Sequence, residues 1–355
     1  MSSSSPKRLR KIIQYLISLL AAVALLYWVF RKQSWEDIVS RIAGVEWYLI
    51  GISLALGLFS HWVRAYRWNL LLEPLGYRPP VGRTLLAVLV GYIANLAIPR
   101  LGEVARCAFL DRKAGVPVAT GFGTVVMERL LDVLSILAIA GIVLCLEFSH
   151  VLGFFREQLL AKGQSINLSA GIWIVLGLCA VAGLALLWWF FKGGGRAVLA
   201  KHPLYRKVEP VVLKFVEGIV SIRNLNRPVQ FWAATFLMWL CYFLMTYLVI
   251  IAYPATSQLG LSEGLAVLVV GGFGMAAPVQ GGFGAYHFLV ANFLLIYNIA
   301  TEDGIALAAL LHTSHTVIVI VVGSIALLLG LLIPRHVNTP LPTEANELDS
   351  SSAGS

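Results

Sequence analysis

Charged residues are scarce in this chain of 355 residues, because Asp, Glu, Lys and Arg together account for only 13% of it. Soluble domains carry roughly 25% charged residues, whereas 59% of this chain is hydrophobic. A chain with so little polar material cannot cover the surface of a water-soluble globule. The composition therefore excludes a soluble globular protein and indicates a membrane protein.

Cysteine is also scarce, and its spacing argues against disulfide or metal chemistry. The four cysteines lie far apart and form neither a C-x-x-C pair nor a metal-ligand spacing. Three of them lie inside hydrophobic runs, so we expect small apolar packing residues at Cys107, Cys145, Cys179 and Cys241. No metal or other cofactor is expected.

Acidic residues are fewer than basic ones, with 18 Asp and Glu against 27 Lys and Arg and a formal net charge of +9. Such a balance is found in nucleic-acid-binding proteins, but here the basic residues flank hydrophobic runs. Membrane topology explains that placement better, so no nucleic-acid partner is expected.

Six apolar runs are long enough to cross a bilayer as helices, which takes about 20 residues. The first run has no small-residue cleavage pattern before "RKQSWED", so we expect a retained helix rather than a signal peptide. The sequence therefore predicts an all-α polytopic membrane protein with crossings at 12–30, 47–66, 122–146, 170–191, 229–252 and 305–333.

Two further apolar stretches, 84–110 and 264–298, are interrupted by "AIPRLGE" and "AAPVQGGFG". Proline and glycine break a helix at such points, so each stretch is either a broken crossing or a re-entrant hairpin.

The charges of the loops favour re-entrant hairpins, because cytoplasmic loops collect Lys and Arg. With two re-entrant hairpins, the basic segments 67–83, 111–120 and 192–228 lie in the cytoplasm together with both termini. The segment 253–263, which has no Lys or Arg, then lies outside. The basic loop 31–46 is the exception. We expect a multi-pass protein of the cell inner membrane.

The two broken stretches resemble one another. A shift of 179 residues aligns "LAVLVGYIANLAIPRLGEVARCAFL" with "LAVLVVGGFGMAAPVQGGFGAYHFL", and ten of the 25 positions are identical. Pro99 then matches Pro278, and Gly102 matches Gly281. Three predicted crossings separate the copies, around 84–110 and 264–290, so the second would enter from the opposite face as an inverted repeat.

The remaining segments complete a chain with one transmembrane domain, residues 12–334. A basic cytoplasmic N-terminus, 1–11, precedes this domain, and a disordered tail, 335–355, follows it. Apolar residues at helical spacing predict amphipathic helices on the bilayer surface at 34–44 and around 204–225.

Three predicted membrane segments carry charges: "HWVRAYRW", "NLAIPRLGEVAR" and "MERLLD". Ionisable residues inside a membrane are by default paired and functional. Glu128 and Asp132 lie one helical turn apart, so an arginine from another element could bridge them. Two structural alternatives stay open: Arg64 and Arg67 could extend to the cytoplasmic interface, and the "MERLLD" charges could form a structural ion-pair network.

In the functional interpretation, several arginines converge on a phosphate, whose oxygens match the planar guanidinium group. A helix that begins after Pro99 would direct free N–H groups at the same anion, while Glu103 and Asp132 hold the arginines. The predicted substrate-binding residues are Arg64, Arg67, Asn95, Arg100, Glu103, Arg106, Glu128, Arg129 and Asp132.

The second broken stretch carries no charge but is rich in glycine, which permits close backbone approach and unwound carbonyl groups. The predicted hinge positions of both stretches are Pro99, Gly102, Pro278, Gly281, Gly282 and Gly284. Three histidines, His287, His312 and His315, could form a proton relay or a metal site. The interpretation we favour is that these histidines are hydrogen-bonded and either line a pore or lie at contacts between helices, because no other metal ligand is evident nearby.

In this order, "RAYRWNLLLEPLG", "GYIANLAIPRLGEVARCAFL", "GTVVMERLLDVLSI" and "APVQGGFGAYHF" resemble the transmembrane region of lysylphosphatidylglycerol synthases, a flippase-like family. The resemblance covers about residues 12–333 and implies lipid translocation without the soluble aminoacyl-transferase domain. It places the family's polar signature on Arg64, Arg67, Asn95, Pro99, Gly102, Glu103, Arg106, Glu128, Arg129 and Asp132. The chain departs from the family at His287, where an acidic residue is common, and at His312, where an arginine is common.

The leading hypothesis is a lipid transporter of the flippase type. Its partners would be the bilayer and an anionic phospholipid or a polyprenyl-phosphate-linked molecule held by intramembrane arginines. One alternative is a membrane enzyme for aminoacyl-phospholipid synthesis or glycosyl transfer. Another is an accessory subunit of a separately encoded lipid-modifying enzyme.

Overall fold

The structure is a computed structural model that describes residues 40–98, 100–161, 225–277 and 279–334, together with Leu20, Val23, Leu26 and Tyr27. Every regular element in these ranges is a helix. The predicted amphipathic helix 34–44 is described from residue 40 onward. Other predictions fall wholly or almost wholly outside the described residues: the crossings 12–30 and 170–191, the amphipathic helix 204–225, both termini, Pro99 and Pro278.

Four described helices are long and apolar enough to cross a membrane. They are α3 (Trp47–Leu72), α6 (Val118–Ala161), α10 (Pro228–Ala252) and α13 (Thr301–Leu332), and they coincide with four of the predicted crossings. The helices α3 and α6 exceed the predicted lengths most, because charged residues that lower the local hydropathy lie inside them rather than beyond their ends. The chain is a multi-pass membrane protein.

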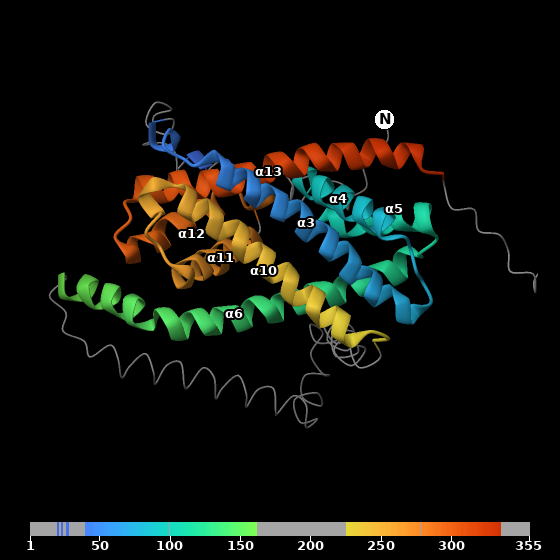
Figure 1. The fold of residues 1–355 in the computed structure, drawn as a ribbon, viewed down its shortest axis with the longest axis horizontal. Coiled ribbons are helices and arrows are strands. Elements are labelled where there is room, and N and C mark those ends of the chain that lie inside the picture. Colours follow the sequence, from blue (N-terminus) through green and yellow to red (C-terminus); the bar gives the residue numbers. More distant parts are fainter. Residues whose placement is uncertain are drawn as a thin grey trace, which may run out of the picture.

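The helices α3 and α10 lie side by side (Figure 1). Small residues line this contact, as is usual where membrane helices pack closely. The hydroxyl of Ser53 donates a hydrogen bond to the carbonyl oxygen of Met245 at 2.9 Å. A Cβ atom at Gly57 would lie 3.3 Å from the end of the same methionine side chain. Close packing of backbones therefore positions the charged part of α3.

Each broken stretch forms two short helices. The first comprises α4 (Val81–Ala97) and α5 (Leu101–Ala114). The second comprises α11 (Leu261–Ala276) and α12 (Ala285–Leu294), joined by the 3₁₀ turn η4 (Gln280–Gly282). Both helix breaks therefore lie where the sequence predicts them.

The backbone is in the left-handed region at both breaks. Arg100 has φ 64°, and the three predicted hinge glycines of the second break have φ 56° at Gly281, 72° at Gly282 and 80° at Gly284. Glycine adopts this conformation without the steric penalty of a side chain. The glycine-rich sequence of the second break is thus a requirement of its backbone.

Each pair of short helices folds back on itself. At the open end of the first pair, the Nη1 of Arg83 near the start of α4 donates a hydrogen bond to the carbonyl oxygen of Lys113 near the end of α5, at 2.9 Å. In the second pair, a Cβ atom at Gly274 of α11 would lie 2.7 Å from the Cα of Tyr286 in α12. Both pairs are therefore helical hairpins.

The hairpins approach one another from opposite ends of the molecule (Figure 1). The first shares its open end with the C-terminus of α13, because the Nζ of Lys113 donates to the carbonyl oxygen of Ile333 at 2.5 Å. The second lies toward the end where α13 begins. The two breaks meet between these ends, where the Nε2 of Gln280 donates a hydrogen bond to the carbonyl oxygen of Leu96 at 2.6 Å.

We predict that Gly102→Ala destabilises the protein, because a Cβ atom there would collide with the Gly91 carbonyl oxygen and the Asn95 side chain. Overpacking of this kind costs about 1–3 kcal/mol. Thermal unfolding in detergent measures the effect. The control is Gly123→Ala in α6, where a Cβ atom meets nothing within 4 Å. If both variants melt alike, the hairpin contact is not as tight as described.

Candidate functional site

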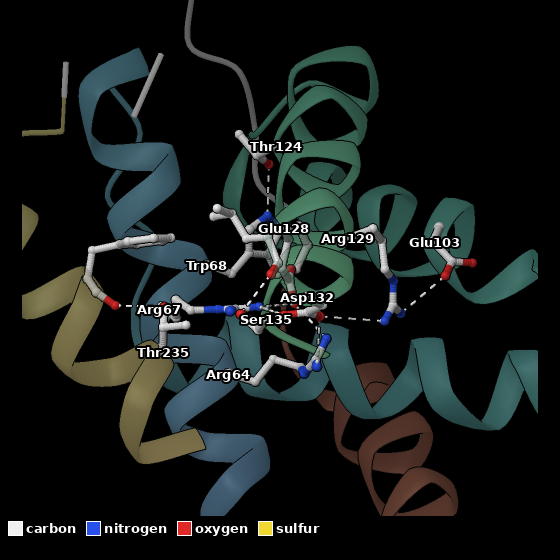
Figure 2. A network of polar contacts seen from close by, with 12 residues as sticks. Arg64, Arg67, Trp68, Glu103, Thr124, Glu128, Arg129, Asp132, Ser135 and Thr235 are labelled. Atoms are coloured by element: carbon white, nitrogen blue, oxygen red, sulfur yellow. Dashed lines mark hydrogen bonds and ion pairs between the residues drawn. The ribbon is translucent and has the colours of Figure 1, made fainter. Parts of the chain in front are cut away.

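The charged residues of three helices converge between the membrane segments (Figure 2). In Figure 2, Arg64 and Arg67 extend from α3 toward Glu128 and Asp132 on α6. The two arginines are three residues apart and the two carboxylates four, so each pair lies on one side of its helix. Arg106 of α5, the third helix, forms an ion pair with Glu128.

The carboxylate of Glu128 is the centre of this cluster and is fully buried. Its oxygens lie 2.7 Å from the Nη1 of Arg64, 3.0 Å from the Nη2 of Arg106 and 3.4 Å from the Nη2 of Arg67. One carboxylate therefore faces three guanidinium groups. Glu128 joins α6 to both α3 and α5.

Asp132, one turn further along α6, shares two of these arginines. Its oxygens lie 2.7 Å from Arg67 and 3.1 Å from Arg64. The predicted bridge between Glu128 and Asp132 by an arginine of another helix is confirmed in Arg64. Because Arg64 is only 5% exposed and Arg67 is not exposed at all, neither extends to the interface.

Aromatic and hydroxyl groups surround the arginines, and the sequence did not single them out. The Nε and Nη2 of Arg64 donate to the hydroxyl of Tyr242 at 3.1 and 3.0 Å. The ring of Trp68 lies 4.6 Å from the guanidinium carbon of Arg106, and its indole N–H donates to Thr124 at 2.8 Å. Trp68 lies one helical turn after Arg64, so its spacing could have predicted that it faces the same site. Tyr242 lies in an apolar run, and no pattern there distinguishes it from its neighbours.

A fourth arginine, Arg129, extends the cluster toward the surface. Its Nη2 lies 3.2 Å from the carboxylate of Glu103 on α5, and its Nη1 lies 3.9 Å from Asp132. These pairs give a continuous chain of charges from α5 through α6 to α3. We call this set the arginine cluster: Arg64, Arg67, Arg106 and Arg129 with Glu103, Glu128 and Asp132.

The arginine cluster has an excess of positive charge and of hydrogen-bond donors. Four guanidinium groups face three carboxylates, which leaves one positive charge. Within the described ranges, no hydrogen-bond acceptor meets the buried Nε and Nη1 of Arg67, the Nε of Arg106 or the Nε of Arg129. Unpaired buried donors are costly. The arrangement can therefore accept one singly charged anion with several oxygen acceptors.

Two predicted substrate-binding residues, Asn95 and Arg100, lie at the first break rather than in the arginine cluster. Asn95 accepts a hydrogen bond from the backbone N–H of Gly102 at 2.6 Å, so it caps the start of α5 from the preceding helix. Arg100 is exposed, and no ion pair to it occurs in the part of the chain that is described. The structure does not bring Arg100 together with the other arginines.

The second break is held by histidine. The Nε2 of His312 lies 3.0 Å from the carbonyl oxygen of Gly281, so this nitrogen carries the proton. The rings of His287 and His312 are 5.1 Å apart. His315 instead contacts the Leu311 carbonyl oxygen of its own helix, at 2.8 Å. The described residues include no group of three or more His, Cys, Asp and Glu side chains that could hold a metal ion.

Long apolar helices, two broken hairpins and a buried ion-pair cluster define a multi-pass membrane protein with a charged site between its helices. Comparison with known families makes the assignment specific. The chain belongs to the lysylphosphatidylglycerol synthase transmembrane region family, which matches residues 14–323.

Two curated proteins show the range of this similarity. The UPF0104 membrane protein MJ1595 of Methanocaldococcus jannaschii is 26% identical over 236 residues, which cover 60% of this chain and 67% of that protein. The glycosyltransferase AglD of Haloferax volcanii is 27% identical over 110 residues, or 31% of this chain and 18% of that protein. No solved structure matches the chain significantly.

We predict that Glu128→Gln destabilises the fold, because the amide keeps the shape of the side chain but leaves three arginines with less counter-charge. Removing one partner of a buried ion pair costs about 3–5 kcal/mol. The matched control is Glu73→Gln, since among the described residues Glu73 pairs with Arg78 and Arg227, whose side chains are exposed. Exposed pairs contribute about 0–1 kcal/mol. Equal unfolding temperatures for the two variants would contradict the central role of Glu128.

Proposed function

We propose that the chain is a lipid transporter of the flippase type that binds the phosphate of an anionic lipid at the arginine cluster. The observation that carries the proposal is the excess of one positive charge and of unpaired N–H donors between membrane helices. Phosphate oxygens accept hydrogen bonds from the planar guanidinium group better than from any other side chain. A bound headgroup would satisfy the donors that the protein leaves unpaired.

The charge balance favours one class of lipid phosphate. A phospholipid such as phosphatidylglycerol carries a phosphodiester with a single negative charge, which matches the single excess positive charge of the arginine cluster. A polyprenyl phosphate monoester carries about 1.5–2 negative charges at neutral pH and would overcompensate it. The anionic phospholipid is therefore the substrate class that we favour, and both lipids belong in the assay.

The proposed movement uses the two hairpins as re-entrant elements of an inverted repeat. Their breaks meet at the hydrogen bond between Gln280 and Leu96, as expected for a site between inverted repeats near the middle of a bilayer. The end that contains Arg83, Lys113 and Arg227 carries the basic loops, so we place it and both termini in the cytoplasm. The headgroup would then approach the arginine cluster from the cytoplasmic side.

A membrane enzyme is the second candidate, because one relative is named a glycosyltransferase. The similar segment covers only 18% of that protein, which favours a membrane region shared by proteins of different activity. In this alternative the chain would act on lipids itself or stabilise a separately encoded lipid-modifying enzyme. Lipid analysis of a deletion strain separates the two: a missing covalent lipid species favours the enzyme, and altered sidedness alone favours the transporter.

We predict that Arg106→Lys slows lipid transport, because lysine keeps the charge beside Glu128 but removes the planar donors, including the unpaired Nε. A hydrogen bond to a charged group contributes about 1.5–3 kcal/mol, so exchange should fall about tenfold or more. The measurement is leaflet exchange of fluorescent phosphatidylglycerol in proteoliposomes, with a polyprenyl phosphate analogue in parallel.

The matched control is Arg78→Lys, whose guanidinium group is exposed and pairs with Glu73 at one end of the molecule. This variant should exchange phosphatidylglycerol at the wild-type rate. Transport by Arg106→Lys at that same rate would remove Arg106 from the binding site.

A further inference from the structure

One member of the arginine cluster differs from the rest in its exposure. The side chain of Arg129 is 41% exposed, whereas those of Arg64, Arg67 and Arg106 are between 0% and 6% exposed. Its partner Glu103 is partly exposed as well. The Glu103–Arg129 pair is therefore the place where the cluster reaches the molecular surface.

The surface around this pair is apolar. Val126 and Val133, one turn before and one turn after Arg129 on α6, are both exposed, and so is Val104, next to Glu103 on α5. In a membrane protein, such a face lies against lipid chains. An ion pair at this position is costly, which points to a role beyond joining two helices.

The Glu103–Arg129 pair also retains binding capacity. Within the described ranges, neither the buried Oε2 of Glu103 nor the buried Nε of Arg129 has a hydrogen-bond partner. Arg129 is 3.9 Å from Asp132, which contacts Arg64 and Arg67, and both of these contact Glu128. An anion that reached Arg129 would thus find further arginines in succession.

We infer that an anionic phospholipid reaches the arginine cluster sideways from the bilayer, between α5 and α6, by displacing Glu103 from Arg129. This inference rests on the proposed function and adds the route of the substrate. The phosphodiester oxygens replace the Glu103 carboxylate at Arg129, so one negative charge substitutes for another. The acyl chains stay in the bilayer against Val104, Val126 and Val133.

The charge-reversed double variant Glu103→Arg with Arg129→Glu tests this route. It keeps an attractive pair between α5 and α6 but presents a carboxylate where the phosphate would first bind. We expect a folded protein, because the pair is retained and the contact that is lost, from Arg129 to Asp132, is long at 3.9 Å. Phosphatidylglycerol exchange should fall about tenfold or more, because a like charge meets the headgroup. Reversing the Arg41–Asp303 pair, 2.5 Å apart at one end of the molecule, is the control and should leave exchange unchanged.

A second variant tests the competition between glutamate and phosphate. Glu103→Gln removes the carboxylate that a phosphate must displace, so vesicles of phosphatidylcholine and phosphatidylglycerol should show roughly two- to fivefold tighter phosphatidylglycerol binding, the range of an exposed ion pair. If the pair only joined α5 to α6, this variant would lose stability and gain no binding. Unchanged or weaker binding would overturn the inference.

The outcomes separate the route from the function. If the wild type exchanges phosphatidylglycerol, Arg106→Lys is slow and the charge-reversed variant is as fast as the wild type, the lateral route is wrong and the transporter stands. If the wild type exchanges lipid no faster than protein-free vesicles, the proposed function fails and the route fails with it. A stable charge-reversed variant with slow exchange supports both.

Discussion

The buried carboxylate of Glu128 is the interaction on which the rest of the described structure depends. Three guanidinium groups from two helices lie around it, and in surroundings of low polarity none of them can lose its counter-charge cheaply. The helices α3, α5 and α6 are consequently fixed relative to one another at one depth. Because α5 is the second helix of the first hairpin, the Arg106–Glu128 pair also fixes the position of this hairpin relative to α6.

The position of the first break follows from this constraint in a few steps. Arg106 lies one turn after Gly102, where α5 contacts α4 so closely that no side chain fits. Asn95 then ties the start of α5 to the end of α4. One residue further along, the carbonyl oxygen of Leu96 accepts the hydrogen bond of Gln280 from the second break. A short series of contacts thus connects the arginine cluster to the glycine-rich turn.

Much of this organisation could be predicted from the sequence, because it depends on local patterns. Hydropathy located the four described crossings, Pro and Gly located both breaks, and the spacing of Glu128 and Asp132 predicted a shared arginine. Contacts between distant helices were beyond such patterns. The two breaks meet through Gln280, which aligns with Leu101 in the other copy of the repeat. Because the two residues differ, the repeat gave no reason to predict a role for Gln280.

Arg100 was predicted to lie with the other arginines, and the structure places it apart from them. It was grouped with Arg106 because the two lie in one charged segment. The structure shows that Arg100 lies just before α5 with a left-handed backbone, whereas Arg106 lies inside this helix. Even in a continuous helix, six residues would place the two side chains on different faces. Helical spacing was a better guide than proximity in the sequence, because it placed Glu128 and Asp132 on one face of α6, where Arg64 contacts both.

The difference between the hairpins bears on which half of the molecule would move during transport. Motion of the first hairpin relative to α3 or α6 would separate buried ion pairs, at a cost of about 3–5 kcal/mol for each pair broken. The second hairpin carries no charge at its break, where Gln280 donates a hydrogen bond to the carbonyl oxygen of Leu96 and His312 donates one to that of Gly281. Three glycines supply its backbone freedom. We therefore expect the charged hairpin to hold the headgroup while the neutral one moves, since this division avoids carrying unpaired charge through hydrocarbon.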